Sequence, residues 1–246
     1  MIDSNKNIND QDIISFDIKG FCLLPCKTSE TQIKLLNTLQ NIDNHKLKPN
    51  SQLSSRYKNT LDLSPSPSKY DDVLLDFVKE NKFLEVARIL TGKDLVCCHT
   101  QLRIAGPNSK YLSWHRDNHA YKNRKVVGNF PSVYKLIFYP CLDHSEKQLA
   151  ISSGSHRKFF TNKFLDFAQI PINKKEYISS NNSYALLFNT QAFHNVVKTT
   201  KSAMRLIYSF VPKNHIHRYG ENPPVHLSSD LPLNYDELPK PTWNKR

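Results

Sequence analysis

A histidine, an arginine and an aspartate follow a tryptophan in the stretch YLSWHRDNHAY, residues 111–121. In an extended chain, side chains two residues apart point to the same face. We therefore expect His115 and Asp117 to face the same way, and Arg116 to face the opposite way. An imidazole and a carboxylate on one face begin a metal site, but a complete site needs at least one further ligand.

The third ligand must come from elsewhere in a chain that contains ten histidines. His194 follows the apolar run SYALLFNT, far enough beyond Asp117 for several strands to intervene and for neighbouring strands to bring the two residues together. The other candidates for this place are His99, His119 and His156. Two imidazoles and one carboxylate leave coordination positions open on one side of a metal, and this donor set suits non-heme Fe(II) and its oxygen chemistry.

A buried cation is predicted at Arg205, which lies beyond His194 within the apolar run AMRLIYSF. A guanidinium among strand-forming apolar residues needs a partner, because an unpaired buried charge is costly. A carboxylate held through two parallel hydrogen bonds is its best partner. A structural ion pair within the protein is the alternative. The position of Arg205 after His194 favours His194 over the other histidines as the third ligand.

The N-terminal part of the chain is predicted to be mostly helical. Residues 1–12 are polar and are interpreted as a loose tail, and the run 14–25 predicts a short strand that ends at Pro25. A helix is predicted over 29–42, with Ser29 as its cap. Residues 44–70 are polar and contain several Ser and Pro, which predicts a loop. A second helical segment over 70–92 is predicted to break near Asn81 and to end at Gly92.

After this point the pattern becomes typical of an all-β body. Short apolar runs with aromatic or β-branched members are separated by turn residues, as in a sandwich or jelly roll. These predicted strands lie within 94–106, 133–142, 149–154, 183–190 and 204–212. Gln101, Arg103 and Lys135 lie on strands expected to border the site, although alternation alone does not decide which face each occupies.

With these features together, the sequence resembles the phytanoyl-CoA dioxygenase-like family of Fe(II)/2-oxoglutarate-dependent oxygenases. The HxD pair, the distant His194 and Arg205 occur in the order of that family. FDIKGFCLLP before a helix, FLEVARILTGKDLVCCHTQLRIAGP before the HxD, and QLAISSGSHRKFF are also similar to it. The resemblance spans about residues 14–212. Ser153 replaces the proline of the usual Pro-Gly-Ser-His, and Val196 stands where some relatives have a hydroxyl.

The resemblance implies a mainly β protein with flanking helices around a double-stranded β-helix, or jelly-roll, core. It implies one domain over 1–246, with the tail at 1–12 and a surface extension at 213–246. Fe(II) would be held by His115, Asp117 and His194, and 2-oxoglutarate by Arg205. Gln101 and Lys135 are further candidates for contacts with 2-oxoglutarate. The implied reaction uses O2 to hydroxylate a small or medium substrate and releases succinate and CO2. A carboxylate at Asp117 argues against halogenation, which in related enzymes needs a small residue there.

The net charge of +12 favours anionic ligands or binding partners. The basic run HAYKNRK, 119–125, either forms a lip over the pocket that holds an anionic substrate or is an ordinary solvated loop. Nucleic acid is a further possible partner, but zinc-finger spacing, a helix-turn-helix and an aromatic-basic strand motif are all missing from the sequence. An anionic small molecule is therefore the expected partner.

Five cysteines, an odd number, and a polar N-terminus predict a reduced cytoplasmic protein without a membrane span, in which Cys22 and Cys26 are buried small hydrophobes. Two alternatives remain open. One is a non-catalytic jelly-roll module that binds a metal or ligand without turnover. The other is an oxygenase that uses the same site for desaturation or cyclisation.

Overall fold

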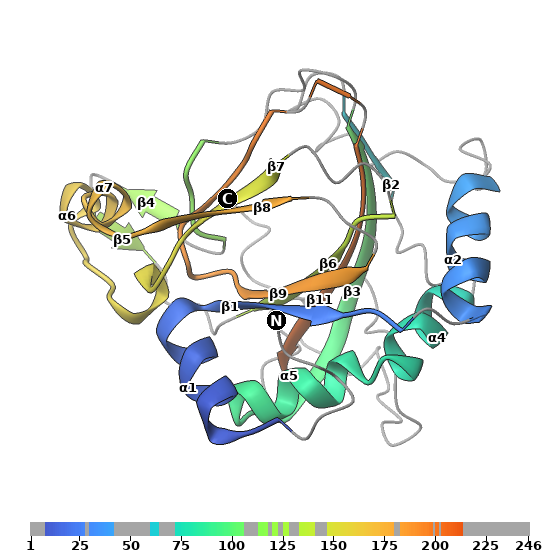
Figure 1. Ribbon diagram of the computed structural model, residues 1–246. Coiled ribbons are helices and arrows are strands. Elements are labelled where there is room, and N and C mark those ends of the chain that lie inside the picture. The colour runs from blue at the N-terminus through green and yellow to red at the C-terminus, as the bar shows by residue number, and fades with distance from the viewer. Residues whose placement is uncertain are drawn as a thin grey trace, which may run out of the picture.

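Two antiparallel sheets form the centre of the molecule (Figure 1). The computed structural model describes residues 8–27, 30–41, 60–63, 72–105, 113–117, 120–122, 125–127, 133–140, 147–179, 183–198, 200–201 and 203–213. Within this part, one sheet has six strands in the order β1-β9-β6-β11-β3-β2, and the other has three in the order β10-β7-β8. A separate pair joins β4 to β5. This mainly β architecture is the double-stranded β-helix that the sequence predicts.

The strands of the large sheet are β1 (Phe21–Pro25), β2 (Thr60–Leu63), β3 (Leu95–Ala105), β6 (Tyr134–Phe138), β9 (Tyr184–Asn189) and β11 (Ala203–Pro212). Those of the small sheet are β7 (Lys147–Ser152), β8 (Lys175–Ser179) and β10 (His194–Val196). The isolated pair consists of β4 (Ala120–Lys122) and β5 (Lys125–Val127). The longest pairing joins β11 to β3, and β11 also pairs with β6 on its other side. Strand β11 therefore holds the middle of the large sheet together.

The helices lie mainly along the outer face of the large sheet, opposite the small sheet (Figure 1). They are α1 (Asp10–Lys19), α2 (Glu30–Asn41), α4 (Asp72–Glu80) and α5 (Phe83–Thr91). Two short helices, α6 (Lys163–Phe167) and α7 (Gln169–Ile172), and the 3-10 turn η2 (Ser155–Arg157) connect β7 to β8. No helix among the described residues is long and apolar enough to cross a membrane.

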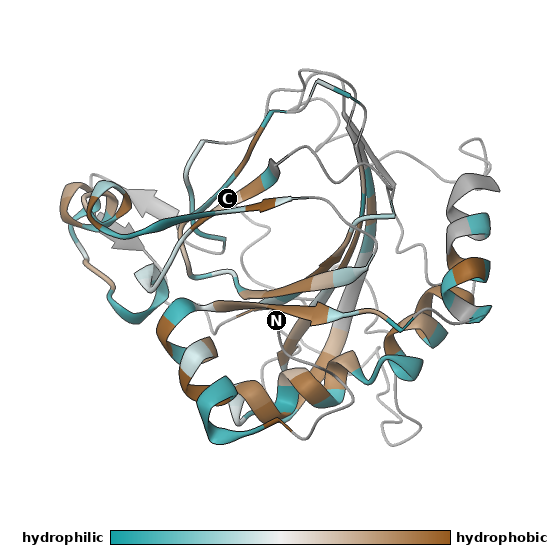
Figure 2. Cartoon of the chain, in the orientation of Figure 1, coloured by the Kyte–Doolittle hydropathy of each residue, from teal (hydrophilic) through white to brown (hydrophobic). Residues whose placement is uncertain are grey.

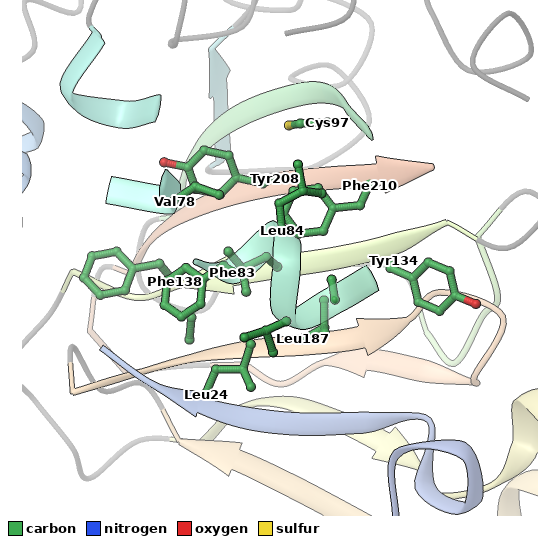
Figure 3. Packing of buried hydrophobic residues seen from close by; sticks show 14 of the residues in the cluster. Leu24, Val78, Phe83, Leu84, Cys97, Tyr134, Phe138, Leu187, Tyr208 and Phe210 are labelled. Carbon is green, nitrogen blue, oxygen red and sulfur yellow. The ribbon is translucent and has the colours of Figure 1, made fainter. Parts of the chain in front are cut away.

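Alternation along each central strand divides the core into two parts. On β11, Leu206, Tyr208 and Phe210 face the helices and belong to the buried cluster that includes Phe77 of α4. Figure 3 shows Tyr208 and Phe210 with Val78 and Leu84 of that cluster. The Tyr208 hydroxyl donates a hydrogen bond to the backbone carbonyl of Leu74, which ties α4 to the sheet. Ile207 points the other way and packs between the two sheets. The apolar colouring of the central strands in Figure 2 follows from this two-sided burial.

The cluster between the sheets, which we call the inner cluster, contains residues from both sheets. Its buried members are Ile137, Tyr139, Leu149, Ile151, Ile178, Leu186, Phe188, Ala192 and Ile207. The surface of the large sheet that carries this cluster is its inner face. Polar side chains on the inner face are directed toward the small sheet.

The predicted helices over 29–42 and 70–92 are confirmed. The second is interrupted at Asn81 and Lys82, and Gly92 closes it with a left-handed φ of 63°. The five predicted strand regions contain β3, β6 and β9 and overlap β7 and β11, which begin two residues and one residue earlier than predicted. Cys97 lies in the core. Cys22 and Cys26 are partly buried and pack against the core cluster, as expected of small hydrophobes. Burial raises the pKa of the Cys26 thiol to about 12.

The N-terminal prediction is wrong in part, because residues 10–19 are helical and only Phe21–Pro25 form a strand. Asn9 and Asp12 form a reciprocal capping box, which satisfies the free N–H groups at the start of α1. Gly20 ends the helix at a φ of 81°. These local signals outweigh the weak alternation of apolar residues in the sequence.

Five further strands, β2, β4, β5, β8 and β10, depart from the prediction. β2 lies inside the predicted loop 44–70 and exists because it pairs with β3. β8 was not predicted because Ile178 is its one buried residue, which leaves no apolar pattern to detect. β10 was not predicted because it is only three residues long. The expected tail at residues 1–7, the extension at 214–246 and most side chains of the basic run 119–125 lie outside the described residues.

Candidate metal centre

Two backbone segments meet to form the site. His115 and His194 form an isolated antiparallel bridge, in which each backbone N–H donates to the carbonyl of the other, at 3.0 and 2.9 Å. The N–H of Asp117 donates to the carbonyl of Thr190 at 3.1 Å. His194 begins β10 of the small sheet, so this strand positions the HxD segment. Backbone hydrogen bonds thus bring the third residue beside the HxD pair.

The side chains of His115, Asp117 and His194 converge. Their candidate ligand atoms all lie within 4.8 Å of one another. The Oδ1 atom of Asp117 is 3.5 Å from Nε2 of His115 and 3.7 Å from Nε2 of His194. The imidazole rings are 4.3 Å apart between centroids. Two nitrogens and a carboxylate oxygen at these separations can be bridged by one metal ion.

Hydrogen bonds to the other ring nitrogen orient both imidazoles. Nδ1 of His115 lies 2.8 Å from the carbonyl of Ser113, and Nδ1 of His194 lies 2.9 Å from the carbonyl of Ala192. A carbonyl only accepts, so each Nδ1 must carry the proton as the donor. Each Nε2 then keeps its lone pair for a metal. This arrangement is typical of metal-binding histidines, in which the second nitrogen fixes the tautomer and the ring orientation.

The local charges keep these groups ready to bind a cation. Burial alone would raise the pKa of Asp117, but Lys135 and the two histidines hold this pKa well below its usual value. The Nζ atom of Lys135 is 2.6 Å from Oδ2 of Asp117. Burial lowers the pKa of His194 to about 4, against the opposing charge of Asp117. Near neutral pH the site therefore offers a carboxylate and a neutral buried imidazole.

Register places the predicted cosubstrate residues on the inner face. In the pairing of β11 with β3, Arg205 lies opposite Arg103, and Ile207 lies opposite Gln101. Paired residues share a face, so Gln101, Arg103 and Arg205 lie on the face of the inner-cluster residue Ile207. Lys135 is two residues before Ile137 on β6 and shares the same face. The structure thus resolves the face that alternation alone left open.

Burial differs between the two ends of this face. Arg205 is 2% exposed and His194 is 4% exposed. The side chains of Asp117 and Lys135 are 20% and 27% exposed, so the metal end is accessible to solvent. A molecule entering from that side would meet the triad first and reach Arg205 last. His156, a rejected candidate for the third ligand, instead packs against Gly20.

Sequence reasoning did not identify two ionic contacts. One is the Lys135–Asp117 pair. The other joins the predicted outward-facing Arg116 to Asp166, with both side chains almost fully buried. Arg116 does face away from His115 and Asp117, as predicted. Neither partner could be assigned from the sequence, because the paired residues belong to different elements and no local pattern links them.

Comparisons with known proteins give matches in structure alone: no family model matches the sequence, and no curated relative is found. The fold is shared with HygX from Streptomyces hygroscopicus, solved with nickel and 2-oxoglutarate, at a TM-score of 0.61 and 15% identity. That alignment covers 84% of this chain and 88% of HygX.

Two further solved structures are similar. One is SnoN, a non-heme α-ketoglutarate-dependent epimerase from nogalamycin biosynthesis, with a TM-score of 0.62, 9% identity, and 81% and 80% of the two chains covered. The other is EctD from S. alaskensis with bound Fe, with a TM-score of 0.59, 12% identity, and 85% and 78% covered. At these identities the comparison establishes the jelly-roll fold.

Proposed function

We propose that this protein is a non-heme Fe(II)- and 2-oxoglutarate-dependent oxygenase. The observation that carries the proposal is the convergence of His115, Asp117 and His194, with the Nε2 atoms 3.5 and 3.7 Å from the same carboxylate oxygen. These donors fit the two-histidine, one-carboxylate set that holds Fe(II) in oxygenases. Solved neighbours of the same fold contain nickel with 2-oxoglutarate, or iron, which supports the same cofactors here.

The residues of this chain would divide the work. His115, Asp117 and His194 would hold the metal. When bound, iron with 2-oxoglutarate supplies the oxidation of a C–H bond by O2, with release of succinate and CO2. The protein contributes the positioning of the reactants and the exclusion of water by the enclosed inner face.

Arg205 is the residue proposed to bind the distal carboxylate of 2-oxoglutarate. Its guanidinium matches a carboxylate in geometry, and its burial makes that interaction strong. Lys135 lies in register with Ser209, four residues beyond Arg205 along β11, which corresponds to about 13 Å. A short dicarboxylate is shorter than this backbone separation, so the long side chains of Lys135 and Arg205 would have to reach toward each other to hold it, with its keto acid end at the metal and its other end at Arg205. Gln101, between the two positions, is proposed as a hydrogen-bonding contact.

The substrate is proposed to be a small or medium anionic molecule. Among the described residues, the inner face and the site carry three cations, Arg103, Lys135 and Arg205, against two carboxylates, Asp117 and Asp62, the latter opposite Arg103 in the register of β2 with β3. Fe(II) and doubly charged 2-oxoglutarate cancel, so a positive excess remains. A substrate with a carboxylate or phosphate would balance it. HygX was also solved with hygromycin B, so this fold accommodates a small molecule next to 2-oxoglutarate.

Hydroxylation is the proposed outcome. The carboxylate of Asp117 occupies the place that a halogenating relative would leave open. Neighbours described as an epimerase and a carbocyclase indicate that the fold also hosts other oxidations, so desaturation and cyclisation are the competing outcomes. The free thiols of Cys22, Cys26 and Cys97 support a reducing, cytoplasmic setting.

The test is spectroscopic and needs no substrate. Protein purified without oxygen is given Fe(II) and then 2-oxoglutarate, and the visible charge-transfer band of the chelated complex is recorded. The parent protein should show the band, and admitting O2 should produce succinate slowly. His194→Ala should show neither. A parent protein without the band contradicts the proposal, whereas a band without any succinate identifies a binding module that does not turn over.

A further inference from the structure

An arginine stands between the two metal-site residues of the HxD segment, and its side chain is buried on the opposite side. The side chain of Arg116 is 1% exposed, and that of its partner Asp166 is 0% exposed. Nε of Arg116 donates to Oδ2 of Asp166 at 3.0 Å, and Nη2 donates to Oδ1 at 2.8 Å. This is the two-pronged geometry that makes an arginine–carboxylate pair both strong and directional.

The remaining donors of Arg116 bind backbone carbonyls from two other segments. Nη1 donates to the carbonyl of Ser155 at 2.8 Å and to that of Gln191, and Nη2 donates to that of Lys158 at 3.1 Å. The guanidinium also lies 4.1 Å from the ring centroid of Phe193. Gln191 and Phe193 belong to the turn that leads into His194. One side chain thus connects the HxD segment, the η2–α6 segment and the approach to the third ligand.

Asp166 is itself held in place. Nε2 of Gln169 donates to its Oδ1 at 2.8 Å, and the N–H of Phe160 lies 3.4 Å from the same oxygen. Asp166 sits on α6, whose start is capped by Asn162. These contacts fix the orientation of the carboxylate independently of Arg116. A rigid acceptor of this kind restricts where the backbone of residues 115–117 can lie.

We infer that Arg116 and Asp166 form a positioning pair that sets the geometry, and thereby the affinity, of the metal centre. Because Arg116 lies between His115 and Asp117 and faces the opposite way, any shift of its backbone moves both neighbouring side chains. Its contact with the Gln191 carbonyl ties the same movement to His194. The inference rests on the proposed metal site and extends it to residues that do not contact the metal.

A purely structural role is the competing explanation, since breaking a buried ion pair also destabilises a fold. The two roles differ in what they change. A structural pair alters the free energy of unfolding and leaves the metal affinity of the folded protein unchanged. A positioning pair also lowers the metal affinity in protein that remains folded. The experiment must therefore measure metal binding and stability in the same variants.

The probe is Co(II), bound to the full chain without oxygen and followed by its visible absorption. Arg116→Lys keeps the charge but loses the two-pronged contact, and Asp166→Asn keeps the shape but loses the charge. Both should bind Co(II) about 10- to 100-fold more weakly than the parent. The double variant Arg116→Met/Asp166→Leu removes both buried charges. It should recover stability relative to Asp166→Asn without recovering Co(II) affinity.

Phe77→Leu is the control for stability. Phe77 is a core residue of α4 and lies outside the network of Arg116. This variant should unfold more readily and still bind Co(II) as tightly as the parent. If Arg116→Lys and Asp166→Asn are folded and bind Co(II) like the parent, the positioning inference is overturned. If the parent protein itself does not bind Co(II), the proposed metal site fails first, and the two failures are thus distinguishable.

Discussion

At the scale of single residues, the site is defined by charged side chains at the two ends of the inner face. Lys135 contacts Asp117 at the metal end, and Arg205 lies deep at the other end. The two cations have different predicted roles. Lys135 competes with a metal ion for the carboxylate of Asp117, whereas Arg205 lies further along the inner face and is predicted to bind the cosubstrate. Substitution of each should therefore change metal and cosubstrate binding in different ways.

Replacing Arg205 should weaken 2-oxoglutarate binding and leave metal binding unchanged. Arg205→Met removes the buried partner of the distal carboxylate, which costs about 2–5 kcal/mol of binding free energy. Arg205→Lys should fall between this variant and the parent, since an ammonium cannot form the two-pronged contact. Titration of 2-oxoglutarate into the Fe(II) protein measures both effects. Lys198→Met, at an exposed lysine, is the matched control. Equal affinities in Arg205→Met and Lys198→Met would contradict the role of Arg205.

Replacing Lys135 should have opposite effects on metal and cosubstrate. The ammonium group lies 2.6 Å from Asp117 and repels any cation at the triad. Lys135→Met should therefore bind Co(II) alone at least tenfold more tightly, because charges ~4 Å apart interact by a few kcal/mol at an effective dielectric constant of 20 and tenfold corresponds to only about 1.4 kcal/mol. The same variant should bind 2-oxoglutarate more weakly, since one anchoring cation is lost. Separate titrations test the two halves, and weaker Co(II) binding would instead make Lys135 a positioning group for Asp117.

At the scale of elements, the join between α1 and β1 determines how the β7–β8 connection packs. Gly20 ends α1 with a left-handed φ of 81°, and the ring of His156 in η2 packs directly against it. The N–H of Gly154 donates to the carbonyl of Lys19 at 3.0 Å. The segment that carries Asp166 therefore begins from a fixed contact with the N-terminal helix. A side chain at position 20 would disturb this contact.

Gly20→Ala should destabilise the fold by about 2–4 kcal/mol. A Cβ at this position would lie 2.5 Å from Nδ1 of His156, and the left-handed conformation itself costs an L-residue about 1–2 kcal/mol. Gly92→Ala is the control, because Gly92 also has a positive φ of 63° but open space around it. Urea unfolding measures both variants. Adding His156→Ala to Gly20→Ala should recover the steric part. Equal losses at positions 20 and 92 would show that the contact with His156 is unimportant.

At the scale of the whole molecule, the metal centre joins parts of the chain that are far apart in sequence. His115 and Asp117 precede β4, whereas His194 begins β10 of the small sheet. The unfolded chain cannot present these three residues together. Metal binding is therefore linked to folding, and a bound ion should stabilise the closed arrangement of the two segments.

Co(II) should accordingly raise the midpoint of thermal unfolding. At a free metal concentration 100 times the dissociation constant, the expected stabilisation is about 2.7 kcal/mol. A chelator should reverse the shift, and His194→Ala should abolish it. His156→Ala, which alters a histidine outside the triad, should retain the shift even though its own stability is lower. A shift of the same size in His194→Ala would mean that Co(II) binds at another site.

Much of the fold could be predicted because its signals are local. Helix α5 has a strong apolar face and a terminating glycine, and the central strands are apolar runs bounded by turn residues. The prediction failed for 10–19, where a capping box outweighs alternation, and for β2 and β8, whose pairing partners define them. Short polar strands carry little information of their own, since distant neighbours stabilise them.

For the site, the amino-acid sequence alone determined the kinds of donor available, their order and the parity that sends Arg116 away from His115 and Asp117. These follow from residue type and from the two-residue repeat of an extended chain. The sequence also favoured His194 as the third ligand, and the tertiary structure places it beside the pair. Tertiary structure alone decided which face carries Gln101 and which carboxylates meet Lys135 and Arg116. Contacts of this kind depend on sheet register and chain crossing, which are set by the packing of the whole core and not by any one segment.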